Sequence, residues 1–73
     1  MRPERETRIN GMFEGWSPNE LYRLMDGSRW KLGRARASRA AMVRPAVKVW
    51  RYEGRFYLEL VENGEFAEVQ QVL

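Results

Sequence analysis

The sequence offers few side chains that could carry out catalysis. It contains no histidine and no cysteine among its 73 residues, so it lacks an imidazole base, a thiolate nucleophile and the usual nitrogen and sulfur ligands of zinc. The hydroxyl groups that could act as nucleophiles instead belong to Thr7, Ser17, Ser28 and Ser38. None of them lies in a Gly-x-Ser-x-Gly elbow or beside an obvious general base.

Carboxylates and glycines do not improve the case for an enzyme. The candidates for a two-carboxylate site are Glu14, Glu20 and Asp26, of which two would be needed, but acids at turns and strand ends ordinarily face solvent. The glycines are spaced as turn and bend residues and form no phosphate-binding loop. We therefore predict a protein that is not an enzyme and that binds no cofactor or metal ion.

Aromatic and basic side chains are better suited to binding a partner. The aromatic residues predicted on strand faces opposite the core are Trp16, Trp50, Tyr52 and Tyr57. The bases predicted to meet an anionic partner are Arg23, Arg29, Lys31, Arg34, Arg36, Arg39, Arg51 and Arg55. Such a surface suits self-association or another protein, because Trp, Tyr and Arg are enriched in interfaces. It also suits sequence-tolerant nucleic-acid binding, with aromatic rings for bases and cations for phosphates.

Charge is distributed unevenly along the chain. Residues 34–55 contain seven bases and one acid, whereas residues 56–73 contain four acids and no base. A basic segment is typical of proteins that bind nucleic acid or another anion. The acidic last segment could instead neutralise it, within one chain or between two chains. The sequence leaves both arrangements open.

The length of the chain indicates how it could be stabilised. A domain of this size buries only about 60% of its unfolded surface, and here neither disulfides nor metal ions can compensate. We therefore predict a homo-oligomer. No apolar run approaches the length of roughly 18 residues that spans a membrane, and the charged start of the chain does not resemble a signal peptide. We expect a soluble, cytoplasmic protein.

Residues 46–61 predict a β-hairpin whose register follows from its side chains. With Glu53-Gly54 as a two-residue turn, Val49 faces Leu58 on one side of the hairpin and Trp50 faces Tyr57 on the other. Lys48 then faces Glu59. A turn that places Gly54 in a bulge would set apolar residues against charged ones, so we favour the first register.

Residues 20–34 predict a second hairpin around Asp26-Gly27. A type I turn closed by a left-handed Gly27 gathers four apolar residues on one face; these are Tyr22, Leu24, Trp30 and Leu32. The cost falls on the opposite face, where Arg23 lies across from Arg29 with Lys31 nearby. Like charges set opposite each other destabilise a sheet, which indicates an acid from elsewhere, a partner subunit or an anionic ligand at this place.

The remaining segments complete an all-β prediction. Residues 1–7 have no apolar side chain after Met1 and are predicted to be a disordered leader. Residues 8–16 predict a curved strand with Ile9 and Phe13 inward. Residues 33–45 suit either a helix or an extended segment, and we favour the extended form. Residues 65–73 predict a last strand with Ala67 and Val69 inward, which Val72 and Leu73 fit only if a bulge near Gln70 and Gln71 shifts the phase.

Five or six short strands with tight turns must roll around one core. We therefore predict that residues 8–73 form a single domain, a small SH3-like barrel of consecutive hairpins, with an OB-type barrel as the alternative.

Three motifs that together span most of the chain carry a family resemblance. They are Phe13-Glu14-Gly15-Trp16, the segment Leu24-Met25-Asp26-Gly27-Ser28-Arg29-Trp30, and Arg44-Pro45-Ala46-Val47-Lys48-Val49. In these motifs the sequence resembles a group of small bacterial domains of unknown function, some of which are carried in mobile gene cassettes. The resemblance implies a small β domain and implies no activity.

Overall fold

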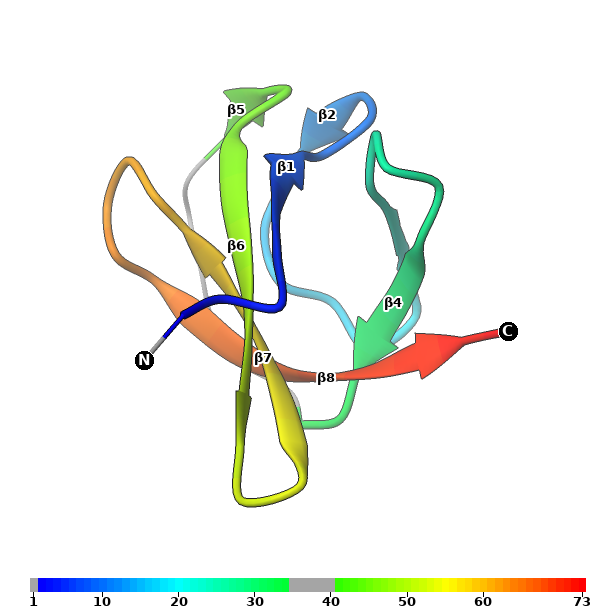
Figure 1. Cartoon of the computed structure of the whole chain (residues 1–73). Helices are drawn as coiled ribbons and strands as arrows, with labels where there is room; N and C mark the ends of the chain where they lie inside the picture. The colour runs from blue at the N-terminus through cyan, green and yellow to red at the C-terminus, as the bar shows by residue number, and fades with distance from the viewer. Residues whose placement is uncertain (1, 35–40) are drawn as a thin grey trace.

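The computed structural model describes residues 2–34 and 41–73, which form strands and turns without a helix (Figure 1). The strands in these residues are β1 (Arg5–Arg8), β2 (Met12–Phe13), β3 (Leu21–Arg23), β4 (Arg29–Leu32), β5 (Met42–Val43), β6 (Ala46–Tyr52), β7 (Arg55–Leu60) and β8 (Phe66–Val72). Six of them form an antiparallel sheet in the order β1-β6-β7-β8-β4-β3, and β2 pairs with β5 in a small separate ribbon. The predicted all-β class with a small, barrel-like sheet is confirmed.

The two outer strands of the six-stranded sheet are linked just beyond β1. Ile9 forms an isolated antiparallel bridge with Leu24 at the end of β3. On either side of it, the Asn10 amide donates to the Arg23 carbonyl and the Met25 amide donates to the Arg8 carbonyl, both at 2.8 Å. These backbone bonds draw the first and last strands of the sheet together, so the curled sheet encloses a core.

The β6–β7 hairpin has the predicted register. Val49 pairs with Leu58, Trp50 with Tyr57, and Lys48 with Glu59. The turn residues Glu53 and Gly54 both have positive φ, at 51° and 78°, as a two-residue type I′ turn requires. Val49 and Leu58 are fully buried, so this register places the apolar face of the hairpin in the core.

The β3–β4 hairpin also has the predicted register. Tyr22 pairs with Trp30 and Arg23 pairs with Arg29. The Leu24 amide donates to the Ser28 carbonyl at 2.9 Å, and Gly27 has a φ of 92°, which a residue with a Cβ rarely adopts. The four apolar residues predicted to share a face are all buried.

The core collects one face of every long strand. Its buried hydrophobic members among the described residues are Ile9, Phe13, Trp16, Tyr22, Leu24, Trp30, Leu32, Val47, Val49, Leu58, Leu60, Ala67 and Val69. At one end, the Phe13 and Trp16 rings meet edge to face with centroids 4.9 Å apart. The buried Tyr22 hydroxyl donates to the Gly15 carbonyl at 2.8 Å and accepts from the Ser17 amide at 2.6 Å. The polar end of Tyr22 is thereby satisfied inside the core.

The prediction of a disordered leader over residues 1–7 is wrong for its second half. Arg5 to Thr7 belong to β1, which pairs with β6 from Arg5 opposite Val49 to Arg8 opposite Ala46. The Glu4 amide extends this pairing with a 2.7 Å bond to the Val49 carbonyl. Strand pairing satisfies backbone groups and needs no apolar side chain, so the polar composition of this segment did not prevent it from joining the sheet.

The last strand differs from the prediction in its second half. No bulge interrupts β8, which pairs in continuous register with β4 from Val69 opposite Leu32 to Val72 opposite Arg29. Val72 therefore lies on the outer face, and Leu73 is exposed. This end of β8 extends past its pairing with β7, which stops at Val69 (Figure 1), so no second layer draws its side chains inward.

The segment whose conformation the sequence left open is described in part. Met42 and Val43 are extended, as β5, and pair with Phe13 and Met12. Residues 35–40 lie outside the described residues. No helix in the described part of the chain is long and apolar enough to span a membrane.

Candidate interaction surface

The outer face of β6, β7 and β8 carries a group of aromatic side chains. Trp50 and Tyr52 alternate with inward residues on β6, Tyr57 lies opposite Trp50 on β7, and Phe66 begins β8. We call these four residues the aromatic surface. Together with Glu59 they line a shallow depression of about 400 Å³. Tyr52 and Phe66 are 53% and 51% exposed, so much of this apolar area faces solvent.

Contacts at the depression position three of the four rings. The Trp50 indole donates to Glu59 Oε1 at 2.9 Å, and Lys48 Nζ lies 5.9 Å from the centroid of the Trp50 ring. Tyr57 and Phe66 meet edge to face with centroids 6.3 Å apart. These rings are therefore preorganised, which lowers the conformational entropy that their side chains lose when a partner binds.

Sequence reasoning named three of the four members. Trp50, Tyr52 and Tyr57 lie together on the outer face, as expected from their alternation with core residues. It did not name Phe66. The signal was present, because the inward assignment of Ala67 and Val69 sets Phe66 outward. Its position beside Glu59 on β7 follows only from the β7–β8 register.

Trp16 does not belong to this surface, contrary to the prediction. It is only 6% exposed, and its indole donates to Glu65 Oε1 at 3.0 Å. The predicted strand over residues 8–16 would have pointed Trp16 outward, but in the structure β2 ends at Phe13 and Gly15 has a φ of 110°. This left-handed residue interrupts the alternation of faces, so Trp16 follows Gly15 into the core.

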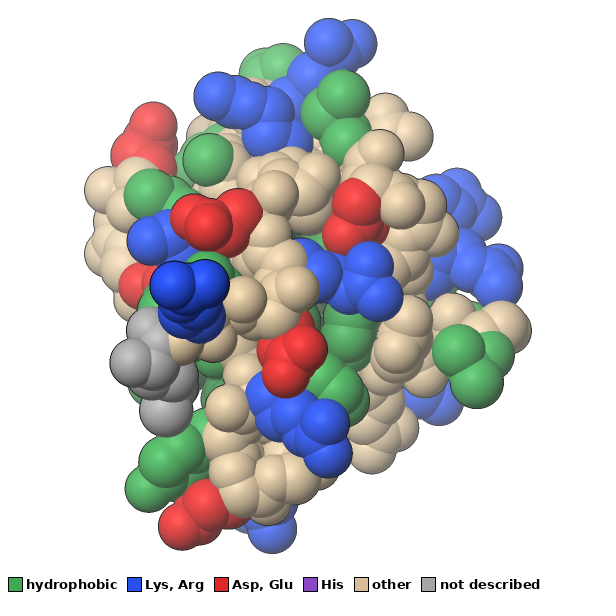
Figure 2. All heavy atoms as spheres, viewed as in Figure 1, with side chains coloured by type: hydrophobic (Ala, Val, Ile, Leu, Met, Phe, Trp, Pro, Cys, Tyr) green, Lys and Arg blue, Asp and Glu red, His purple; other side chains and the backbone are tan. Residues whose placement is uncertain are grey.

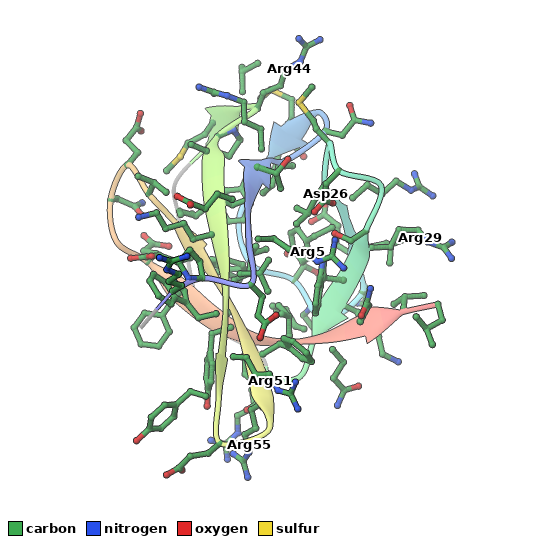
Figure 3. The ribbon with its side chains drawn as sticks, viewed as in Figure 1. Arg5, Asp26, Arg29, Arg44, Arg51 and Arg55 are labelled. Carbon is green, nitrogen blue, oxygen red and sulfur yellow. The ribbon has the colours of Figure 1, made fainter. Side chains whose placement is uncertain are left out.

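A second surface consists of Arg23, Arg29 and Lys31, which we call the basic patch. All three are exposed on the outer face of β3 and β4, with Arg23 directly opposite Arg29. Arg29 projects away from the β4 ribbon (Figure 3), and basic side chains gather along this edge of the molecule (Figure 2).

The basic patch takes no part in the ion pairs of residues 2–34 and 41–73. Those ion pairs are Arg5 with Asp26 and Arg55 with Glu68. Residues 35–40, outside the described part, contain no acid in the sequence. Within the described residues, the repulsion expected between Arg23 and Arg29 is thus not offset by an ion pair with an acid.

The other bases named from the sequence are dispersed. Arg51 lies with its guanidinium carbon 5.8 Å from the centroid of Phe56, and Arg55 Nη1 lies 3.9 Å from Glu68 Oε1; both are near the free end of the β6–β7 hairpin (Figure 3). Arg34 is exposed just after β4. Arg36 and Arg39 lie outside the described residues. Among the described bases named from the sequence, the structure therefore brings only Arg23, Arg29 and Lys31 together as a cluster.

Three of the four acids of residues 56–73 have partners inside the chain. Glu59 accepts from Trp50, Glu65 accepts from Trp16, and Glu68 pairs with Arg55. Because β8 is the neighbour of β7 in the same sheet, part of the charge difference between residues 34–55 and 56–73 is met within one subunit.

The candidate carboxylate Asp26 has a structural role. Its Oδ1 accepts from the Ser28 amide at 2.9 Å and from Ser28 Oγ at 2.6 Å, while Oδ2 accepts from Arg5 Nη1 at 3.0 Å. Partial burial raises the pKa of Asp26, but the hydrogen bonds from Ser28 and the bond and charge of Arg5 together outweigh it, so the pKa lies below its usual value. Ser28 Oγ in turn accepts from the buried Trp30 indole at 2.9 Å.

Nowhere in the described part of the chain do three or more acids, histidines or cysteines lie together so that they could hold a metal ion. Comparisons of the chain with protein-family models, with curated proteins and with solved structures found no match.

Proposed function

We propose that this chain is a non-enzymatic protein-interaction module that self-associates through its aromatic surface. The observation that carries the proposal is the placing of Trp50, Tyr52, Tyr57 and Phe66 around one open depression on the outer face of the sheet. Trp and Tyr are the residues that most often dominate binding energy in interfaces. Trp50 bonds to Glu59, and Tyr57 packs against Phe66, before any partner arrives.

The size of the chain also supports self-association. A single core of 73 residues supplies only a few kcal/mol of net stability, about 3–5 kcal/mol for chains of this length. Burying the aromatic surface against a second copy would remove further apolar area from water, at about 25 cal/mol per Å². A second copy is the partner that is always present at the same concentration.

Sedimentation of the wild-type protein at high micromolar concentration tests the proposal. We expect a mass of at least two chains, and a shift toward the mass of one chain in Trp50→Ala. Val43→Ala is the matched control, because Val43 is an exposed apolar residue on β5, away from the aromatic surface. A wild-type protein that sediments as a single chain would refute self-association.

Sequence-tolerant binding of single-stranded nucleic acid is a second candidate function. The basic patch supports it, because none of its three cations belongs to an ion pair of the described residues, and because, like the aromatic surface, it lies on the outside of the curled sheet. Proteins that bind single strands combine cations for phosphates with exposed rings on which bases stack. The salt dependence of oligonucleotide binding tests this candidate.

A further inference from the structure

We propose that the aromatic surface receives a guanidinium group of the basic patch from a second copy of this chain. The inference rests on the proposed self-association and identifies the side chains that meet between the two copies. Arg23 and Arg29 are the donors, and the rings around Glu59 are the acceptor. Each contact then joins two different surfaces, which makes it heterologous and allows copies to connect head to tail.

The acceptor has the chemistry that binds cations. The face of an aromatic ring carries negative potential, and a cation within about 6 Å of its centroid is attracted, with Trp the best acceptor. Here Trp50, Tyr52, Tyr57 and Phe66 surround one depression, and the Glu59 carboxylate lines it as well. The bond from Trp50 to Glu59 at 2.9 Å keeps the strongest ring beside the negative charge.

The chain already uses this type of contact within itself. Lys48 Nζ lies 5.9 Å from the Trp50 centroid, on the aromatic surface itself. The guanidinium carbon of Arg51 lies 5.8 Å from the centroid of the Phe56 ring, and that of Arg5 lies 6.0 Å from the centroid of the Trp30 ring. Lys48 also faces Glu59 across the β6–β7 hairpin, so a cation already lies beside Trp50 and this carboxylate within one chain.

Transfer of the Arg23 and Arg29 guanidinium groups from water to the aromatic surface is favoured by their environment. Arg23 and Arg29 face each other across two strands, and neither belongs to an ion pair within the described part of the chain. A guanidinium is weakly hydrated and stacks on aromatic faces more readily than an ammonium does. Contact with the rings and with Glu59 of a second copy would relieve the repulsion between these two arginines and cover the exposed area of Tyr52 and Phe66.

Two kinds of variant separate the donor from the acceptor. Trp50→Leu keeps an apolar side chain but removes the indole, and Tyr57→Leu is a second acceptor variant in case the first is unfolded by circular dichroism. The double variant Arg23→Gln/Arg29→Gln removes the donor charges while keeping long polar side chains. Its matched control is Arg2→Gln/Arg44→Gln, which removes two exposed charges elsewhere.

Sedimentation equilibrium measures the association of each variant. We expect about a tenfold or greater weakening for the acceptor variants and for the donor variant, and no change for the control. An equimolar mixture of Trp50→Leu with Arg23→Gln/Arg29→Gln should form a one-to-one complex more tightly than either variant associates alone. The first variant keeps its arginines and the second keeps its aromatic surface, so one intact contact is restored.

Other outcomes overturn the inference and distinguish it from the proposed function. A monomeric wild type removes both. A wild-type oligomer that survives Arg23→Gln/Arg29→Gln unchanged, or a mixture that associates no better than its components, removes only the arginine contact and leaves aromatic self-association in place. Association that disappears after nuclease treatment would show that nucleic acid bridges the copies, and would assign the basic patch to phosphates instead.

Discussion

The Arg5 guanidinium donates to the Asp26 carboxylate at 3.0 Å although 21 residues separate them in the chain. The pair ties β1 to the turn between β3 and β4 (Figure 3). It thereby links the two edge strands of the six-stranded sheet, β1 and β3. Arg5 also lies 6.0 Å from the ring of Trp30, and Asp26 reaches the same ring through Ser28. A surface ion pair of this kind contributes little alone, but this one belongs to a network that ends on a buried indole.

We predict that Asp26→Asn destabilises the fold by about 1–3 kcal/mol, because the amide cannot accept from Ser28 and Arg5 as the carboxylate does. The lowered pKa of Asp26 adds a pH dependence with a defined sign. The stabilisation is present above the ordinary carboxyl pKa of about 4 and is lost as the pH falls through the lower pKa of the folded state.

Thermal unfolding between pH 7 and pH 2 measures this dependence. The wild type should lose more stability on acidification than Asp26→Asn does. Glu14→Gln is the control, since Glu14 is an exposed acid and should leave the acid sensitivity of the wild type intact. Equal acid sensitivity of the wild type and Asp26→Asn would show that the network does not contribute.

Trp16 and Trp50 should respond differently to truncation. We predict that Trp16→Ala costs about 3–5 kcal/mol, as for other buried aromatic residues, because it removes a ring packed on Phe13 and leaves Glu65 without its indole donor. Trp50→Ala should cost less in thermal unfolding of the dilute protein and should act mainly on association. A larger loss of stability for Trp50→Ala than for Trp16→Ala would contradict the assignment of the two residues to surface and core.

The turn of the β6–β7 hairpin contains a residue whose substitution should stabilise the fold. Glu53 has a φ of 51°, and type I′ turns favour Asn at this position followed by Gly. We predict that Glu53→Asn raises the free energy of unfolding by about 0.5–1 kcal/mol, whereas Glu53→Val lowers it because a β-branched residue avoids positive φ. Denaturant titration measures both, and a stabilised Glu53→Val would argue against this turn.

Nucleic-acid binding is predicted to follow the basic patch. Fluorescence anisotropy of labelled single-stranded oligonucleotides should rise with protein at low salt and fall steeply as salt increases, because phosphate contacts release counterions. Neutralising Arg23, Arg29 and Lys31 together should reduce the salt slope by about one unit for each phosphate that the variant no longer binds. Anisotropy that stays flat up to high protein concentration would remove this candidate function.

The two hairpin registers could be predicted from the sequence because each depends on local information. The Glu53-Gly54 turn and the alternation around it specify that Val49 faces Leu58 and Trp50 faces Tyr57, and the structure has both pairs. The same holds for Tyr22 and Trp30 around Asp26-Gly27. A slip of one residue would expose every core side chain of a hairpin, so the pattern leaves one acceptable register. The outward direction of Trp50, Tyr52 and Tyr57 follows from it.

Tertiary structure alone decided the contacts between distant segments. Arg5 belongs to a strand that pairs with β6, and backbone pairing leaves no signature in side-chain composition. Trp16 turned inward because Gly15 adopts a positive φ, a choice that glycine permits but does not dictate. Phe66 reached Tyr57 because β8 pairs with β7 in one of several registers that alternation would allow. Local sequence determines which face a side chain takes within a hairpin, and the pairing of remote strands determines which of those faces meet.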